Sequence, residues 1–266
     1  MKFIHSLSLL LHDGQDILLS KILRLSNPIL LFGAFITFSN ISYSQDFHSS
    51  LQARNSHLWR GIEVASGLVF TGDLHLDGKY FYGGFWGGGS GDGVYKEFNN
   101  YAGFKKGRFN VELWDIYNFS PAATYNNTEF FNYNANETGR FLDFRSNYTI
   151  SENFPLTLSW NAVLFGRDRN VQNTENKYSY FASAEYLLYE KETLKVKGRI
   201  GYSSALNSAG EKNNFFAHKS GLNEVSLIVS KEIPIMGFEL PIGIWAMWNP
   251  VDNHGYLQFS AEVYSF

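Results

Sequence analysis

The sequence predicts an all-β fold, an up-and-down antiparallel transmembrane β-barrel of about 12 strands with an N-terminal signal segment. Three observations predict it. Apolar and polar residues alternate along many segments, short and longer connections alternate between those segments, and aromatic residues, 17% of the chain, gather near segment ends. Transmembrane barrels require this combination because each strand has a lipid face and an interior face.

Composition narrows the classes of protein. At 266 residues the chain suits one large all-β domain. Its net charge of −3 gives no basic footprint for nucleic acid. The absence of cysteine excludes disulfides, zinc-thiolate sites and cysteine nucleophiles. Many rings with a slightly negative mean hydropathy also suit a soluble sugar-binding β-sandwich, and this alternative stays open.

Residues 1–44 form the predicted signal segment. An apolar run at 29–38 follows Lys21 and Arg24, and small residues at 42–44 precede the expected cleavage point. That order is typical of a secretory signal peptide. The alternative is a buried or anchoring helix, although the run is short for a membrane span. Where translation starts within this segment stays open.

The mature domain is expected to span residues 45–266 without a linker. Two-residue alternation is clearest at 141–150, 156–165 and 194–202. Successive side chains of a strand point to opposite faces, and a tilted membrane strand needs about 9–11 residues. We therefore expect strands near 50–60, 67–77, 79–88, 96–105, 108–119, 140–150, 155–165, 177–189, 193–203, 222–232, 238–248 and 255–266.

The connections between these strands alternate in length. Short turns are expected at Asp77–Lys79, Lys105–Gly107, Ser151–Phe154, Glu190–Glu192 and Pro234–Gly237, and longer loops at Gly87–Gly93, Ser120–Gly139, Gly166–Asn176 and Ser203–Ser220. Outer-membrane barrels place tight turns on the periplasmic side and longer loops outside. An even strand count then puts both termini in the periplasm. Gly87–Gly93 lacks the lysine and helix of a phosphate-binding loop, so we interpret it as a mobile loop.

Rings on the apolar faces form two predicted belts. At the loop ends of strands stand Phe119, Tyr178, Tyr180, Tyr202 and Trp248, and at the turn ends stand Tyr148, Tyr186 and Phe238. Two belts match two membrane–water interfaces. A general preference of aromatic residues for strands explains their number but not these positions.

Two strands depart from simple alternation. Tyr264 and the C-terminal Phe266 stand on the parity opposite to the apolar face of the last strand, which predicts a β-bulge near its end. Asp115 falls on the apolar parity of its strand, which predicts a register break near Trp114. The terminal Phe266 is typical of proteins that the outer-membrane assembly machinery inserts.

The polar faces should line the barrel interior. The lumen-lining candidates are Glu112, Asp143, Arg145, Glu185, Lys195, Lys197, Arg199 and Glu224. The polar faces of the strands also carry Asp73, Asp77, Glu239 and Glu262. These charges can form a constriction that tunes solute passage. Alternatively they pair across the lumen and fill it, because twelve strands lie between filled and open barrels. Both interpretations stay open.

A short stretch carries a family resemblance. Trp59-Arg60-Gly61 ends the first strand, Tyr82-Gly83-Gly84-Phe85-Trp86 forms the third, and a strand from Asp115 runs to Pro121. In these motifs residues 50–121 resemble the TorF-type, or Gcw-type, outer-membrane porin family. The resemblance implies an outer-membrane barrel with a porin role. For Arg60 we favour capping of loop carbonyls over pointing inward at a solute.

The sequence thus predicts a passive channel for small hydrophilic solutes in the outer membrane, reached after export through the periplasm. Its expected partners are outer-membrane lipid, the assembly machinery and the solute, with no nucleic acid, cofactor or metal. Alternatives are a non-conducting barrel that binds a partner through loops 120–139 and 203–220, and a barrel-borne hydrolase. The latter is less favoured because none of the five histidines after residue 44 stands by a serine-nucleophile motif. The solute, the state of the lumen and the oligomeric state stay open.

Overall fold

The computed structural model describes residues 45–235 and 237–266, so the predicted signal segment 1–44 lies outside the described residues. No helix among the described residues is long and apolar enough to cross a membrane. The described strands are β1 (Asp46–Trp59), β2 (Ile62–Asp77), β3 (Phe81–Ser90), β4 (Lys96–Lys106), β5 (Phe109–Asn118), β6 (Arg140–Thr149), β7 (Leu156–Gly166), β8 (Ser179–Lys191), β9 (Leu194–Ala205), β10 (Gly221–Ile235), β11 (Phe238–Asn249) and β12 (His254–Ser265).

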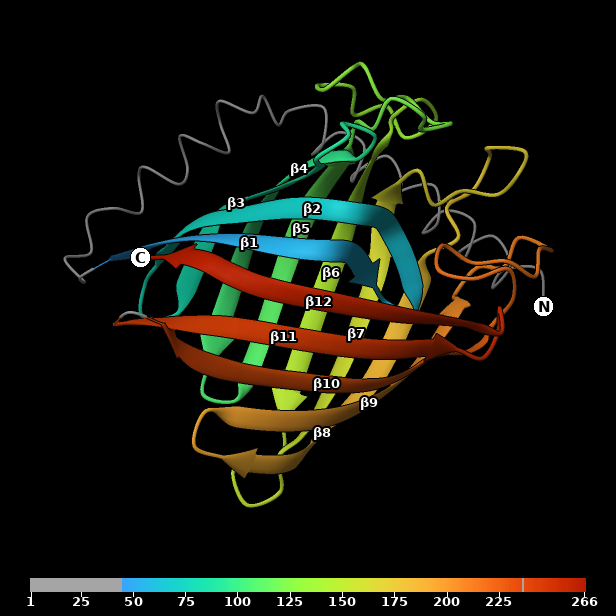
Figure 1. Cartoon of the computed structure of the whole chain (residues 1–266). Coiled ribbons are helices and arrows are strands. Elements are labelled where there is room, and N and C mark those ends of the chain that lie inside the picture. The colour runs from blue at the N-terminus through green and yellow to red at the C-terminus, as the bar shows by residue number, and fades with distance from the viewer. Residues whose placement is uncertain (1–44, 236) are drawn as a thin grey trace. The chain divides into compact units, whose positions relative to one another are not determined.

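These strands form one closed antiparallel barrel, which confirms the predicted fold class. Each strand pairs with its neighbours in sequence, and β12 pairs with β1 to close the sheet (Figure 1). Closure gives every strand a partner on both sides, so the sheet has no free edge. At the seam, the backbone N–H and C=O of Phe266 bond to those of Ser49 at 2.8 and 2.9 Å.

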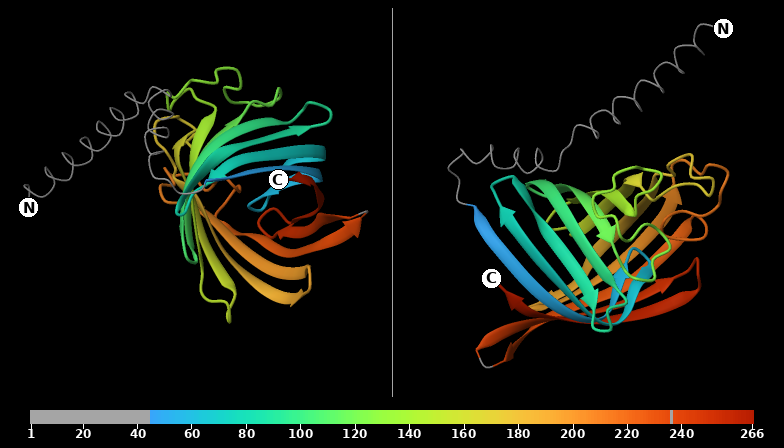
Figure 2. Two further views of the ribbon diagram at one scale, coloured as in Figure 1. Left: turned by 90° about the vertical axis from the view of Figure 1, so that its left-hand side faces the viewer. Right: turned by 90° about the horizontal axis from the view of Figure 1, so that it is seen from above.

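The long loops all lie at one end of the barrel, and the connections at the other end are short. The turn end carries the β2–β3, β4–β5, β6–β7, β8–β9 and β10–β11 connections together with the start of β1 and the end of β12. The loop end carries the long β5–β6 (119–139), β7–β8 (167–178) and β9–β10 (206–220) loops. Figure 2 shows these loops gathered at one end of the barrel. The predicted long loops are present at β5–β6, β7–β8 and β9–β10, whereas the β3–β4 connection (91–95) is short, as are β1–β2 and β11–β12 at the same end.

The outer face of the wall is apolar. On β7, the side chain of Leu158 is 46% exposed, whereas Val163 on the opposite parity is 1% exposed. Exposed rings lie near both ends of the strands, including Tyr202 and Trp248 toward the loops and Tyr148 toward the turns. An exposed apolar surface this extensive matches a wall that contacts lipid rather than water.

The bulge predicted in the last strand is present. In the β1–β12 pairing, Leu51 faces Tyr264 while the next residue, Gln52, faces Glu262. Val263 is therefore the extra residue, and the shift brings Tyr264 to the exposed outer face. The ring of Phe266 contacts that of Phe47 with centroids 6.4 Å apart.

The register break predicted near Trp114 is wrong. The β4–β5 and β5–β6 pairings run through Asp115 without a shift, so its carboxylate stands on the outer parity. Two neighbours explain how a carboxylate can stand on the outer wall: Arg140 at the start of β6 and Tyr133 in the β5–β6 loop. Arg140 bonds to both Asp115 oxygens at 2.8 and 2.9 Å, and Tyr133 donates to Oδ2 at 2.7 Å. The guanidinium also lies over the Phe130 ring, so loop side chains cover the pair.

The glycine-rich segment is a strand rather than a mobile loop over most of its length. Gly87, Gly88 and Gly89 belong to β3 and pair with both β2 and β4. A Cβ on Gly88 would lie 2.8 Å from the Trp86 ring and 3.1 Å from that of Tyr95. Because glycine has no side chain, position 88 leaves room inside the barrel for these two rings.

Candidate functional site in the barrel interior

The tip of the β1–β2 hairpin leaves the barrel wall at the loop end. Pairing of β1 with β12 ends at Arg54, and pairing of β2 with β3 begins at Val69, so between these points the two strands pair only with each other. Two register shifts interrupt this part of the β1–β2 ladder. Bulges of this kind bend a hairpin. Figure 1 shows the end of β1 and the start of β2 curving away from their neighbours.

The hairpin tip spans the mouth of the barrel. Arg60 and Gly61 form a two-residue turn with φ angles of 46° and 85°. The guanidinium of Arg60 donates two bonds of 2.8 Å to the carboxylate of Asp143 on β6. From the other side, the Asn223 amide on β10 donates to the carbonyl of Arg60, and the Asn249 amide on β11 to that of Gly61. The expectation that Arg60 caps loop carbonyls is therefore wrong: it points inward and forms a buried ion pair.

Aromatic side chains pack around this tip. Trp59 contacts Phe216 of the β9–β10 loop at a centroid distance of 5.3 Å and Phe141 of β6 at 6.0 Å. Phe215 lies 4.8 Å from Phe141, and the Arg60 guanidinium lies 4.6 Å from the Trp59 ring. The β9–β10 loop thus contributes to an apolar cluster inside the wall, which narrows the barrel at its loop end.

A cavity of about 430 Å³ adjoins this cluster. Three arginines line it, and among the described residues only one of them bonds to a carboxylate: Arg145 donates to Asp143 at 2.7 Å. Arg54 bonds to neutral groups, Gln52 and His57, and the buried Nε of Arg167 has no hydrogen-bond partner. Burial lowers the pKa of Arg167 from its ordinary value.

A single carboxylate opposes these arginines in the lining. Glu97 accepts hydrogen bonds from the side-chain amides of Asn99 at 2.8 Å and Asn118 at 3.2 Å. Rings of Trp86 and Tyr125 complete much of the wall. Because Asp143 offsets the charge of Arg145, the other two arginines of the lining face the one carboxylate of Glu97, and the cavity carries an excess of positive charge.

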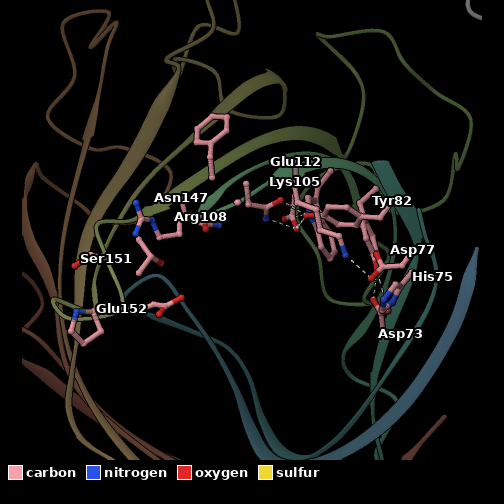
Figure 3. A pocket seen from close by; sticks show the side chains of 17 residues that line it. Asp73, His75, Asp77, Tyr82, Lys105, Arg108, Glu112, Asn147, Ser151 and Glu152 are labelled. Atoms are coloured by element: carbon pink, nitrogen blue, oxygen red, sulfur yellow. Dashed lines mark hydrogen bonds and ion pairs between the residues drawn. The ribbon is translucent and has the colours of Figure 1, made fainter. Parts of the chain in front are cut away.

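A second cavity, of about 750 Å³, lies toward the turn end (Figure 3). Glu112 accepts from the Tyr82 hydroxyl at 2.6 Å and from the Trp114 indole at 2.7 Å. Trp114 lines both cavities, stacks on Tyr101 with centroids 4.2 Å apart and lies 3.8 Å beneath the Arg145 guanidinium. This ring therefore stands where the two cavities approach each other.

The charges of β8, β9 and β10 pair along the wall rather than across the barrel. Glu185 bonds to Lys197 at 2.9 Å and to Arg199 at 2.5 Å, and Arg199 also approaches Glu224 at 3.5 Å. Lys195 instead pairs with Glu190 in an exposed contact near the β8–β9 turn. All these partners stand on adjacent strands or on the same hairpin, so these particular ion pairs do not cross the barrel interior.

The sequence predicted some of the residues that shape this interior and missed others. The structure brings Asp143 and Arg145 to the Arg60 tip, places Glu112 in the larger cavity, and puts Trp59 and Trp86 in the smaller one. The contributions of Trp114, Arg167 and Phe215 were not predicted. Loop residues carry no parity, and rings on a polar face resemble any strand aromatic, so the sequence pattern holds no signal for them.

One group of side chains among the described residues can hold a metal ion. Potential ligand atoms of His48, His75 and Asp77 all lie within 4.8 Å of one another. The sequence predicted no metal site, because His48 and His75 stand 27 positions apart and become neighbours only through the β1–β2 register.

No family model matches the chain, and no curated protein matches it. The chain is similar to the COG4313 outer membrane channel from Pseudomonas putida F1, with 11% identity, a TM-score of 0.43, and 85% of this chain and 97% of that chain covered. It is also similar to a solved chain described as "Unveiling the Mechanism Behind the in-meso Crystallization of Membrane Proteins", with 12% identity, a TM-score of 0.47 and 83% of each chain covered. The TorF-type resemblance stays a prediction.

Proposed function

We propose that the chain is an outer-membrane barrel that forms a porin-like passive channel for small hydrophilic solutes. The observation that carries this proposal is the contrast between an exposed apolar outer wall and interior cavities lined by charged and polar groups. Solutes would diffuse down their gradient through this interior without a cofactor.

Placement in the outer membrane rests on the physics of the wall. In lipid every backbone N–H and C=O needs an internal partner, and a closed barrel supplies them all. The exposed rings near both strand ends suit the two interfaces of a bilayer. Export through the periplasm and insertion by an outer-membrane assembly machinery belong to the same proposal.

The smaller cavity supports a preference for anions. Arg54, Arg145 and Arg167 line it against the single carboxylate of Glu97. An interior with an excess of one charge concentrates ions of the opposite sign and repels those of the same sign. We therefore expect chloride and small organic anions to pass more readily than cations of similar size.

A specific observation favours a second candidate, a non-conducting barrel that binds a partner through its outer loops. The Arg60–Asp143 ion pair and the rings of Phe215 and Phe216 hold the β1–β2 hairpin tip and part of the β9–β10 loop across the loop end of the barrel. If this closure is permanent, solutes do not pass, and the long loops become the functional surface.

Single-channel recording in planar lipid bilayers separates the two candidates. A channel gives steady conductance steps, and a salt gradient then gives a reversal potential of the sign expected for anion preference. Arg167→Met should shift that potential toward cation preference, whereas Lys195→Met, which changes an exposed pair at the turn end, is the matched control. A silent bilayer with both the native chain and a variant that lacks the Arg60–Asp143 pair refutes the channel.

A further inference from the structure

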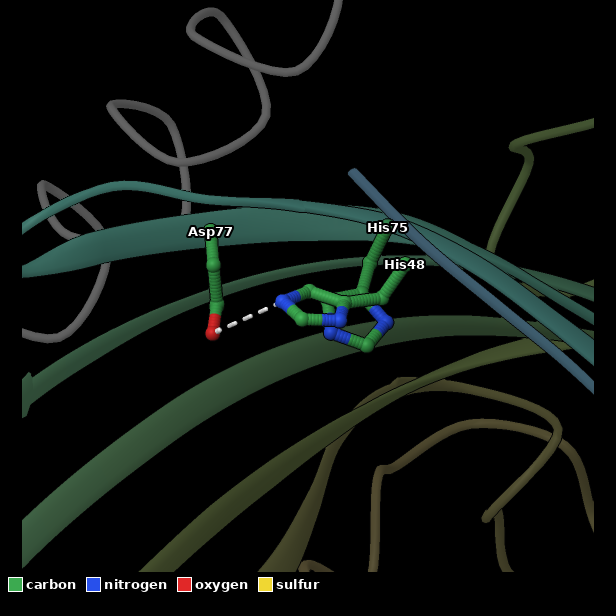
Figure 4. Close-up of side chains that lie close together, drawn as sticks. All are labelled: His48, His75 and Asp77. Carbon is green, nitrogen blue, oxygen red and sulfur yellow. Dashed lines mark ion pairs between the residues drawn. The ribbon is translucent and has the colours of Figure 1, made fainter. Parts of the chain in front are cut away.

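Two histidines face each other across the first hairpin near the turn end of the barrel. His48 on β1 pairs directly with His75 on β2. Directly opposed residues of an antiparallel pair project from the same face, and these two rings stack with centroids 4.9 Å apart. Asp77 stands two residues after His75 and so shares its face. Figure 4 shows all three side chains converging on one point.

The donor atoms are close to the separation that a metal ion requires. His48 Nε2 lies 3.9 Å from Asp77 Oδ2, and ligand atoms from all three residues fall within 4.8 Å of one another. Tetrahedral coordination with bonds of about 2.0–2.1 Å places ligand atoms about 3.4 Å apart. The difference is about 0.5–1.4 Å, and the three side chains already project from the same face of the hairpin.

A second carboxylate prepares His75 for metal binding. Its Nδ1 lies 2.5 Å from Asp73 Oδ1, and the hydroxyl of Tyr101 donates to both oxygens of Asp73 at 3.0 and 2.9 Å. A carboxylate only accepts hydrogen bonds, so Nδ1 is the donor, and in the neutral imidazole Nε2 then offers its lone pair to a metal ion. Metal-binding histidines are commonly oriented by a carboxylate in this manner.

The metal site opens to a cavity, and a lysine competes with the metal ion for one of its ligands. Asp73, His75 and Asp77 line the larger cavity, which leaves room for water ligands and a route for entry. Lys105 is the competitor, because its Nζ lies 2.6 Å from Asp77 Oδ2. Its side chain is 43% exposed, so an incoming cation can displace it toward solvent.

We propose that His48, His75 and Asp77 bind a divalent transition-metal ion on the inner wall of the barrel, at its turn end. Two imidazoles and one carboxylate favour ions such as Zn²⁺, Ni²⁺ and Cu²⁺ over Mg²⁺ and Ca²⁺, which prefer oxygen ligands. With three protein ligands the site keeps positions for water, so the ion exchanges with the solution in the lumen.

Calorimetric titration of the detergent-purified protein with ZnCl₂ tests this site, using an affinity tag without histidines. We expect saturable binding of one ion. His48→Asn and His75→Asn should each weaken it at least about 10-fold, as loss of ligands does in metal sites. Lys105→Met should tighten binding by removing the competing charge. His218→Asn is the matched control, because His218 pairs with Asp252 at the loop end and should leave the affinity unchanged.

Electron paramagnetic resonance with Cu²⁺ gives an independent count of the ligands. The native chain should show coupling to two imidazole nitrogens, and His48→Asn to one. A circular dichroism spectrum identical to that of the native barrel establishes that each variant is folded. Native affinity in both folded histidine variants, or the absence of saturable Zn²⁺ binding to the native chain, overturns the proposal.

Discussion

Replacing Arg60 with methionine removes the ionic contact that holds the hairpin tip to β6. Methionine keeps much of the apolar stem that packs on Trp59 but loses both 2.8 Å bonds to Asp143. Both side chains of the pair are buried, at 8% and 0% exposure, so solvent screens the interaction little. Asp143 keeps Arg145 as a partner, which places the loss at the lower end for a buried pair, about 3 kcal/mol.

A loss of this size changes the balance between a closed and a released hairpin tip by about 150-fold, at 1.36 kcal/mol for each factor of ten. We expect larger or longer conductance steps in planar bilayers and faster amide hydrogen exchange in the hairpin tip. The amides of Asn223 and Asn249 still bond the tip, so the barrel itself should stay folded.

The control is Glu190→Gln, which removes an exposed pair of the same charge type and should change neither readout. Unaltered conductance together with unaltered hydrogen exchange in Arg60→Met would refute the role of this ion pair as a latch. Faster exchange without any conductance would instead favour the non-conducting barrel.

Three further substitutions or conditions test individual contacts. Asp115→Ala leaves the buried guanidinium of Arg140 without its carboxylate partner. The free energy of unfolding in vesicles, measured by urea titration, should fall by about 3 kcal/mol. A decrease below about 1 kcal/mol would contradict the role of this ion pair. Gly61→Ala places a Cβ 2.3 Å from a backbone carbonyl of β10 at a positive φ, so amide exchange should show a displaced hairpin tip, and native exchange rates would count against the close approach. The hydrogen bond from Lys177 lowers the pKa of Glu211. The contact therefore stabilises the β9–β10 loop above the ordinary carboxyl pKa, and this stabilisation is lost as pH falls through the lower pKa of the folded state. Proteolysis of the loop should accelerate below about pH 4, and a rate independent of pH would reject this contact.

The wall of the barrel could be predicted from the sequence, because period-two alternation and turn chemistry act locally. Leu158 and Val163 fall on the faces that their parity assigns. Even the departure at Tyr264 was predictable, since a change of parity within one strand requires an extra residue. These features depend only on residues that are close in the chain.

The interior could not be predicted in the same way. Arg60 meets Asp143 across the barrel, 83 positions away, and only the inward bend of the hairpin brings them together. Asp115 likewise keeps its parity because a loop residue, Tyr133, and Arg140 neutralise it on the outer wall. Contacts of this kind depend on where loops fold, and alternation carries no information about that.

The most direct test of the account is a nitroxide scan along β7 of the protein in lipid bilayers. The chain has no cysteine, so each single cysteine introduced from Leu156 to Gly166 carries the only label. Labels at Leu158 and Leu164 should be accessible to oxygen dissolved in lipid, and labels at Ser159 and Asn161 to a water-soluble nickel complex. Alternation with a period of two residues is the predicted result. Uniform accessibility to the nickel complex on both faces would contradict a barrel whose outer wall contacts lipid.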